Sequence, residues 1–405
     1  MSDFDVEEKL NVLARSVLSI DPNVTDSMNI ALILESMGIS DTYAKNYGHT
    51  NVFSLAKDVF SRIEFYRSHE RIAPKLPPLD QRGFVSLYLS GLIQCFPWII
   101  LMVAILATGV SLYATVKLAA DYATMVGLAV YLSLIASGFV IYPLGRRLAF
   151  NLGNKAYELA RKNLKEHYYA STIGVLAMAG TLYLINRVIN LYSESLMNLF
   201  LLFFVALTAL WVLTGPLFSM QKYGAMTVIF IVGVIVLGSV FYGVLGGEVK
   251  TLISAQLFAI AVAGITAGIS SFAYLYLSKT IDREMKERAW LDGILTLREP
   301  RRAIVFLENI PYALYGGLYF MFLLADRILV MNLHGIYNLR GPYVLWFNMI
   351  YEIPANYALP IFIPLIALTV YYVTRGWVTL LTESRERKLK DIKNFRRMMI
   401  RFYKK

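Results

Sequence analysis

The sequence predicts an all-α, polytopic membrane protein of about eight transmembrane helices with a small N-terminal helical bundle in the cytoplasm. Composition is the first reason: 57% of the 405 residues are hydrophobic and 17% are charged, whereas average soluble domains are nearly half apolar and one quarter charged. The second reason is clustering, because several windows of about 20 residues between 87 and 373 contain hardly any charge, which is the length needed to cross hydrocarbon. Together these features exclude an ordinary soluble enzyme.

Residues 1–72 are predicted to form the cytoplasmic bundle. Apolar residues recur at helical spacing over 6–18, 28–37 and 52–66, and Asp26 is placed to cap the second of these helices. We expect the apolar residues to form a core of their own. The stretch 73–83 contains three prolines and predicts a semi-rigid linker to the membrane. The N-terminus lacks the basic and apolar regions of a secretory signal peptide.

The membrane region is expected to comprise a six-helix lobe over 84–277, a basic cytoplasmic linker over 278–305 and two further transmembrane helices over 306–374. The last helix contains Pro354, Pro360 and Pro364, which predict a kink or break. The spans are placed at 84–114, 122–144, 171–191, 196–218, 226–245, 252–277, 306–330 and 344–373.

Orientation follows from the distribution of Lys and Arg, which concentrate on cytoplasmic loops. The loop 145–170 and the linker 278–305 are rich in both residue types, so we expect both termini to be cytoplasmic and the protein to lie in the cell membrane. The loop segment 146–167 has the pattern of an amphipathic helix that continues from the span 122–144 along the cytoplasmic interface. The tail 375–405 is predicted to be a basic amphipathic helix lying on anionic lipid, with a solvated basic tail as the alternative.

Several classes of function are not indicated. The formal net charge is +11, but a basic excess in a membrane protein favours anionic lipid over nucleic acid as its partner. The single cysteine, Cys95, and the four histidines lie far apart, so local spacing assembles neither a disulfide framework nor a metal site. No phosphate loop, nucleophile elbow or zinc-protease motif is present. We therefore expect no enzyme activity, cofactor or metal.

Ionisable residues inside the spans are the candidate functional residues, because a charge in hydrocarbon is costly unless it is paired or faces a cavity. Glu352 is the sharpest candidate, since it lies beside a helix interrupted by prolines, an arrangement that transporters use to bind substrates and ions. A structural hydrogen bond to a neighbouring span would explain Glu352 nearly as well. For Arg187, Asp326 and Arg327, snorkelling of the side chain to the interface is an equal alternative. The remaining candidates are Arg187, Glu308, Asp326 and Arg327.

Short motifs along the membrane region are similar to those of a known family. They are Cys95-Phe-Pro-Trp-Ile-Ile100, Tyr131-Leu-Ser-Leu-Ile-Ala-Ser-Gly-Phe139, Tyr312-Ala-Leu-Tyr-Gly-Gly-Leu-Tyr319 with Ala325-Asp-Arg327, and Ile350-Tyr-Glu-Ile-Pro354 with Ile363-Pro364. In order and spacing they resemble the polysaccharide transporters of Pel exopolysaccharide export, within the multidrug/oligosaccharidyl-lipid/polysaccharide flippase superfamily. The chain departs from that pattern at Phe96, Asn151, Arg327 and Glu352.

The resemblance implies alternating access of two lobes, export of a polymer or lipid-linked sugar, and no covalent chemistry. It implies ion coupling by Glu352, an outer gate or lobe contact at Asp326 and Arg327, and contact of Arg187 with an anionic substrate. Those flippases have two similar lobes, so we expect a membrane partner or a homo-oligomer to complete the second. The competing hypothesis is a non-transporting scaffold whose N-terminal bundle recruits a cytoplasmic glycosyltransferase or another envelope-biogenesis partner.

Overall fold

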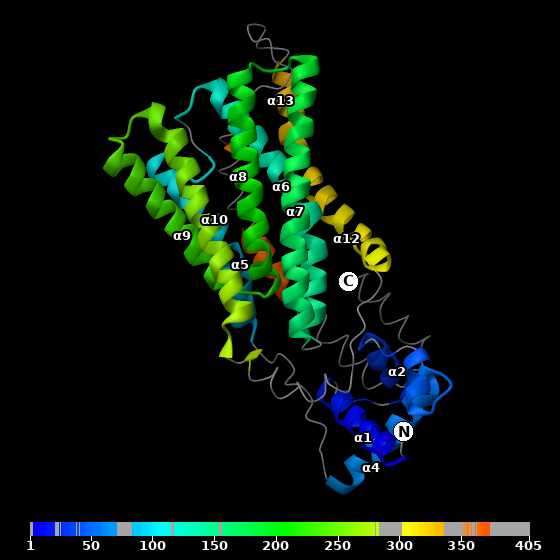
Figure 1. The fold of residues 1–405 in the computed structure, drawn as a ribbon. Helices are drawn as coiled ribbons and strands as arrows, with labels where there is room; N and C mark the ends of the chain where they lie inside the picture. Colours follow the sequence, from blue (N-terminus) through cyan, green and yellow to red (C-terminus); the bar gives the residue numbers. More distant parts are fainter. Residues whose placement is uncertain are drawn as a thin grey trace. The chain divides into compact units, whose positions relative to one another are not determined.

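The computed structural model describes residues 3–20, 24, 26–37, 39, 41–70, 83–114, 117–153, 156–279, 281–282, 302–335, 351–352, 354–355, 358, 361 and 363–372. Every regular element within these ranges is a helix (Figure 1), which confirms the predicted all-helical class for them. The chain divides into two compact units, one with the N-terminal helices and one with most of the apolar helices.

The N-terminal helices bury a shared apolar core. Leu13, Val17, Leu34 and Leu55 are almost fully buried in it. Helix α2 begins where Asp26 accepts a hydrogen bond from the backbone N–H of Asn29 at 2.8 Å, as expected of an N-cap. The elements are α1 (Asp3–Ile20), α2 (Ser27–Ser36), α3 (Asp41–Ala44), η1 (Lys45–Tyr47) and α4 (Val52–Glu70).

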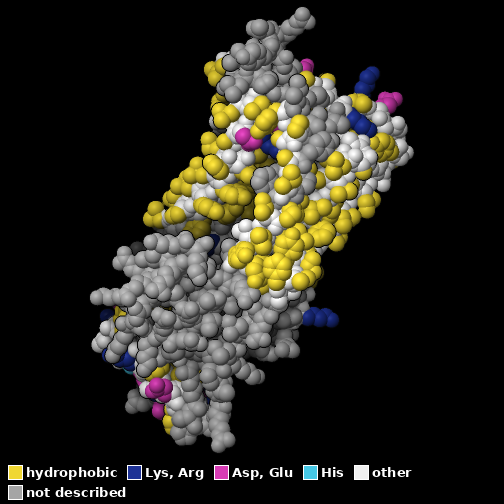
Figure 2. Space-filling model, turned by 180° about the vertical axis from the view of Figure 1, so that it is seen from behind, with side chains coloured by type: hydrophobic (Ala, Val, Ile, Leu, Met, Phe, Trp, Pro, Cys, Tyr) yellow, Lys and Arg dark blue, Asp and Glu magenta, His cyan; other side chains and the backbone are white. Residues whose placement is uncertain are grey.

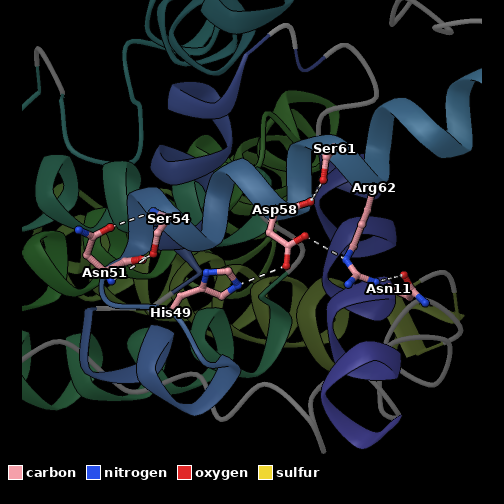
Figure 3. A network of polar contacts seen from close by, with 7 residues as sticks. All are labelled: Asn11, His49, Asn51, Ser54, Asp58, Ser61 and Arg62. Carbon is pink, nitrogen blue, oxygen red and sulfur yellow. Dashed lines mark hydrogen bonds and ion pairs between the residues drawn. The ribbon is translucent and has the colours of Figure 1, made fainter. Parts of the chain in front are cut away.

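A polar network fastens α4 to its neighbours in this unit (Figure 3). Arg62 of α4 donates to the side chain of Asn11 on α1 at 2.9 Å and also contacts Asp58, 3.4 Å away. His49, in the loop before α4, lies 3.2 Å from the same carboxylate. Asp58 therefore joins the loop to the α1–α4 contact.

Six of the described helices are long and apolar enough to cross a membrane, and the bent pair α12–α13 gives a seventh if it is one span. The expected eighth span, 344–373, lies only in part within the described residues, which include a short apolar helix, Ile363–Tyr372. The elements are α5 (Phe84–Thr108), α6 (Ala120–Gly153), α7 (Tyr157–Ile189), α8 (Glu194–Ser219), α9 (Tyr223–Gly238), η2 (Ser239–Val244), η3 (Val249–Thr251), α10 (Leu252–Tyr276), α12 (Arg302–Leu323) and α13 (Ala325–Gly335).

Helix α8 is the centre of the membrane unit, where it packs against α6, α7, α9 and α10 (Figure 1). Its side chains Phe203, Phe204 and Leu207 are fully buried. Trp211 lies between Trp98 of α5 and Phe230 of α9, with ring centroids 6.0 and 6.1 Å away. The large side chains of α8 thus fill the space between its neighbours.

Two helix boundaries differ from the sequence prediction. Helix α5 ends at Thr108 because Gly109 adopts a left-handed conformation, with φ of 73°. The segment 146–167 continues the expected span 122–144 as far as Gly153, where α6 ends, but from Tyr157 onward it is the beginning of α7. The apolar face of this segment is buried between the two helices, where Leu148 and Leu164 share a core.

Apolar side chains cover much of the described membrane helices on the face that Figure 2 shows. Val188 of α7 is 85% exposed and Ile269 of α10 is 65% exposed. Such exposure would be unfavourable in water but is expected of a helix that faces lipid. The predicted interfacial helix of the tail 375–405, and most of the basic linker 278–305, lie outside the described residues.

Candidate functional site

The site is centred on the carboxylate of Glu352, which is 2% exposed. Arg327 of α13 donates to its Oε2 atom at 2.7 Å. The hydroxyl of Tyr131, on α6, donates to its Oε1 atom at 2.5 Å. Each carboxylate oxygen therefore has a strong donor, and both donors are themselves buried. We call Tyr131, Arg327 and Glu352 the buried triad.

Electrostatics explain why these groups occur together. A single charge at this position would be costly, because apolar helices provide no water to solvate it. Pairing Glu352 with Arg327 neutralises both charges, and the hydrogen bond from Tyr131 satisfies the remaining carboxylate oxygen. The triad is therefore a neutral, satisfied cluster that links α6 to α13.

A bend in the chain positions Arg327. Helices α12 and α13 meet at an angle of 50° over the break between Leu323 and Ala325, whereas the sequence predicts one continuous span over 306–330. After the bend, the buried residues Leu324, Arg327 and Met331 recur at helical spacing. This spacing places Arg327 on the buried face of α13.

Asp326 points elsewhere, although it is adjacent to Arg327 in sequence. Its side chain is exposed and accepts a hydrogen bond from the Tyr351 hydroxyl at 2.7 Å. Neighbouring residues on a helix point about 100° apart, so Asp326 and Arg327 use different partners. Both partners, Tyr351 and Glu352, are consecutive in the chain, which gives two parallel contacts between this segment and α13.

Glu308 lies at the other end of α12, away from the triad in sequence. Its backbone carbonyl accepts a hydrogen bond from Arg146 at 3.3 Å, and its carboxylate lies 3.9 Å from the same guanidinium. Arg146 also lies over the ring of Tyr312, with 4.4 Å between the guanidinium carbon and the ring centroid. These contacts join the end of α6 to the start of α12.

The remaining predicted residues are not part of the triad. Arg187 is exposed near the end of α7 and makes no hydrogen bond or ion pair with any residue that the structure describes. Pro354 and Pro364 are exposed, and Pro360 lies outside the described residues. Within the described ranges, no three His, Cys, Asp or Glu side chains form a possible metal site.

Glycines let α6 and α12 approach closely enough to build this region. A Cβ atom added to Gly138 of α6 would lie 2.5 Å from the carbonyl oxygen of Gly316. A Cβ atom on Gly316 or Gly317 would collide with the Tyr142 or Phe139 ring, respectively. Small residues commonly allow such close contacts between the backbones of membrane helices.

Sequence reasoning did not identify Tyr131, Tyr351 or Arg146 as partners of the acidic candidates. The chain contains 27 tyrosines, and spacing alone does not distinguish a tyrosine that binds a carboxylate from one that packs in an aromatic belt. The carboxylate gives the useful signal, because a carboxylate inside a span requires hydrogen-bond donors on other helices. That rule predicts that a donor exists and leaves its identity to the packing of the helices.

Comparison of the chain with protein-family models, curated proteins and solved structures finds no match.

Proposed function

We propose that this protein is a flippase-like membrane transporter, or a subunit of one, that exports polysaccharide or lipid-linked saccharide by alternating access. The buried triad is the observation that carries the proposal. A buried ion pair contributes little to stability compared with apolar residues of the same volume. Its presence next to the bend between α12 and α13 therefore favours a role in function, as intramembrane charges have in many transporters.

The triad provides a mechanism for coupling. Protonation of Glu352, or binding of a cation to it, would weaken its contact with Arg327 and so loosen α13. An equilibrium between two conformations shifts only when a ligand binds one of them more tightly. In this mechanism the proton or cation binds the conformation in which Glu352 and Arg327 are separated, while Asp326 and Tyr351 act as the outer gate.

Replacement of Glu352 by glutamine tests the coupling. Glutamine keeps the shape but not the charge, so a charge-assisted hydrogen bond of about 1.5–3 kcal/mol is lost. Such a change alters the ratio of two conformations about tenfold or more. In proteoliposomes with a fluorescent lipid-linked oligosaccharide, we expect Glu352→Gln to lower proton-dependent flux by that factor.

Glu308→Gln is the matched control, because it makes the same chemical change at an exposed carboxylate of the same unit. We expect its flux to match that of the unaltered protein. Melting of each purified variant shows whether it remains folded. Full proton-dependent flux in a folded Glu352→Gln variant would remove the coupling role, and absence of flux in the unaltered protein would argue against transport.

The proposal includes an orientation in the cell membrane. Most described Lys and Arg of the membrane unit lie at the end where α6 meets α7 and α8 meets α9, which favours a cytoplasmic position for that end and for both termini. Arg187 lies at the opposite end, where it would meet an anionic substrate on the outside. Apart from Arg327 of the buried triad, the described cations at the proposed cytoplasmic end are Arg146, Arg147, Arg161, Lys162, Lys165, Lys222 and Lys279, against Lys117, Arg187 and Lys250 at the other.

Alternating access requires two lobes around a cavity. In this proposal α5–α10 form one lobe, and α12, α13 and the segment after them begin the second. A membrane partner or a second copy of the chain supplies its other helices. The mass of the native assembly in nanodiscs, with identification of every co-purifying chain, is the direct measure of this arrangement.

A scaffold that recruits a cytoplasmic glycosyltransferase is the second candidate function. The N-terminal helices favour it, because they have a core of their own and still expose large apolar side chains. Met28 and Leu32, one turn apart on α2, are 48% and 60% exposed. An apolar pair on the surface of a small helical unit is typical of a contact with another protein.

The double substitution Met28→Glu/Leu32→Glu tests the scaffold. We expect a glycosyltransferase to co-purify in fixed ratio with the full-length chain and to be lost from the variant, because charge disfavours an apolar contact. Mass spectrometry of both preparations measures this. The same partner at the same ratio in both preparations would show that this face of α2 does not recruit it.

A further inference from the structure

A row of tyrosines follows the contact between α6 and α12. Tyr312, Tyr315 and Tyr319 lie on one face of α12, since they are separated by three and four residues. Tyr142 of α6 meets two of them: its ring centroid lies 5.4 Å from that of Tyr315 and 6.5 Å from that of Tyr319. We call these four residues the tyrosine track.

The track and the buried triad share one face of α6. Tyr131 and Tyr142 are eleven residues apart, which is three helical turns, or about 16 Å. Gly138 lies on the same face and forms the close crossing with α12. Arg146, one turn beyond Tyr142, lies over the ring of Tyr312 at the end of the track. Polar groups thus follow this face from the charged end of α6 to the triad.

Depth distinguishes the track from an ordinary aromatic belt. A belt lies at the membrane surface, which suits Tyr312 beside Arg146. Tyr319 is seven residues further along α12 and therefore about 10 Å further along the helix axis. Exposure does not decrease in that direction, because Tyr312, Tyr315 and Tyr319 are 40%, 60% and 45% exposed.

The hydroxyl groups indicate what surrounds the track. Those of Tyr142, Tyr315 and Tyr319 make no hydrogen bond with the residues that the structure describes. A hydroxyl in hydrocarbon without a partner is costly, whereas a hydroxyl in a water-filled path is not. The exposed side of the track is therefore better suited to water and a polar ligand than to lipid tails.

We propose that the tyrosine track is a water-accessible path along which a saccharide moves, with its sugar rings stacked on the tyrosines. A sugar ring has an apolar C–H face and a rim of hydroxyls, which match the face and the polar tip of tyrosine. Several similar, weak contacts in series allow a ligand to enter and also to leave. This inference rests on the proposed transport function and adds to it the substrate chemistry and the path.

Accessibility to a water-soluble reagent tests the path without any measurement of flux. Single cysteines are placed at Tyr315 and Tyr319 in a Cys95→Ala background. Matched controls are Leu314→Cys and Leu318→Cys, which lie at the same depths on another side of α12 and are 48% and 53% exposed. Because thiols react as thiolates in water, we expect a membrane-impermeant maleimide to label the tyrosine positions about tenfold faster than the controls in nanodiscs.

Equal labelling at the tyrosine and leucine positions would overturn the path, even if flux depends on Glu352. Faster labelling together with full flux in Glu352→Gln would support the path and contradict the coupling mechanism. Neutral hexasaccharides of β-linked glucose and of β-linked N-acetylglucosamine test the ligand. We expect at least one to slow labelling at Tyr319→Cys, and to lose this effect in a second variant that also carries Tyr142→Leu. No protection by either sugar would overturn the saccharide assignment.

Discussion

Replacement of Arg327 by methionine is expected to destabilise the protein by about 3–5 kcal/mol, because it leaves the buried charge of Glu352 without a counter-charge. The carboxylate is 2% exposed, so water does not replace the lost partner. The hydrogen bond from Tyr131 remains, but a single neutral donor does not compensate for the desolvation of a carboxylate. The free energy of unfolding, from titration with SDS in mixed micelles, measures the loss.

The double variant Arg327→Met/Glu352→Met distinguishes the effect of an unpaired buried charge from the effect of changed packing. Both charges are then absent, and we expect most of the stability to return, since apolar residues often replace a buried ion pair without loss. Asp326→Asn is the matched control at the adjacent position. Its carboxylate is exposed, so its removal is expected to change the free energy of unfolding by less than about 0.5 kcal/mol.

Similar decreases in the free energy of unfolding for Arg327→Met and for the double variant would contradict this account. They would show that Arg327 stabilises the protein through packing and not through its charge. A loss only in the single variant would agree with an ion pair that is retained for a reason other than stability. With the single variant Glu352→Met added, the four proteins form a double-mutant cycle that gives the coupling energy between Arg327 and Glu352.

Much of the membrane architecture could be predicted from sequence because it depends on local composition. The windows that contain Phe203 and Ala259 are apolar whatever their neighbours are, and continuous apolar stretches of this length form helices in a bilayer. The helix boundaries were less predictable. Gly109 ends α5 through its positive φ, and the amphipathic pattern around Leu148 fits equally well against lipid or against a neighbouring helix.

The contacts of the site depend on tertiary packing and could not be predicted in the same way. Sequence reasoning identified Glu352 and Arg327 as ionisable groups within spans that require partners. It did not pair them with each other, because the 50° bend after α12 determines where Arg327 points. Tyr131 carried no signal of its own, since its contact with Glu352 joins residues 221 positions apart.

Alanine at Gly316 is expected to destabilise the protein by about 1–3 kcal/mol, because the added methyl group overpacks the crossing of α6 and α12. At this position a Cβ atom meets the carbonyl oxygen of Gly138 and the ring of Tyr142. The carbonyl belongs to the backbone of a helix, so it cannot move unless the helix moves. The helices must therefore separate or slide.

Gly180→Ala in α7 is the matched control, since a Cβ atom there meets nothing within 4 Å. Alanine has a better helix propensity than glycine by about 0.5–1 kcal/mol, so this variant is expected to be slightly more stable than the unaltered protein. The two substitutions are chemically identical and should change the free energy of unfolding in opposite directions. Gains of the same size in both would show that α6 and α12 do not cross in close contact.

The crossing also determines how α6 faces α12 and α13, because Gly138 lies on the same face as Tyr131 and Tyr142. A shift of α12 by one methyl group would move Tyr315 and Tyr319 away from Tyr142 and change the position at which α13 presents Arg327 to Glu352. We therefore expect folded Gly316→Ala protein to lose proton-dependent flux, whereas Gly180→Ala retains it. Flux that is unchanged in Gly316→Ala, despite reduced stability, would mean that the close contact supports the fold and is not required for transport.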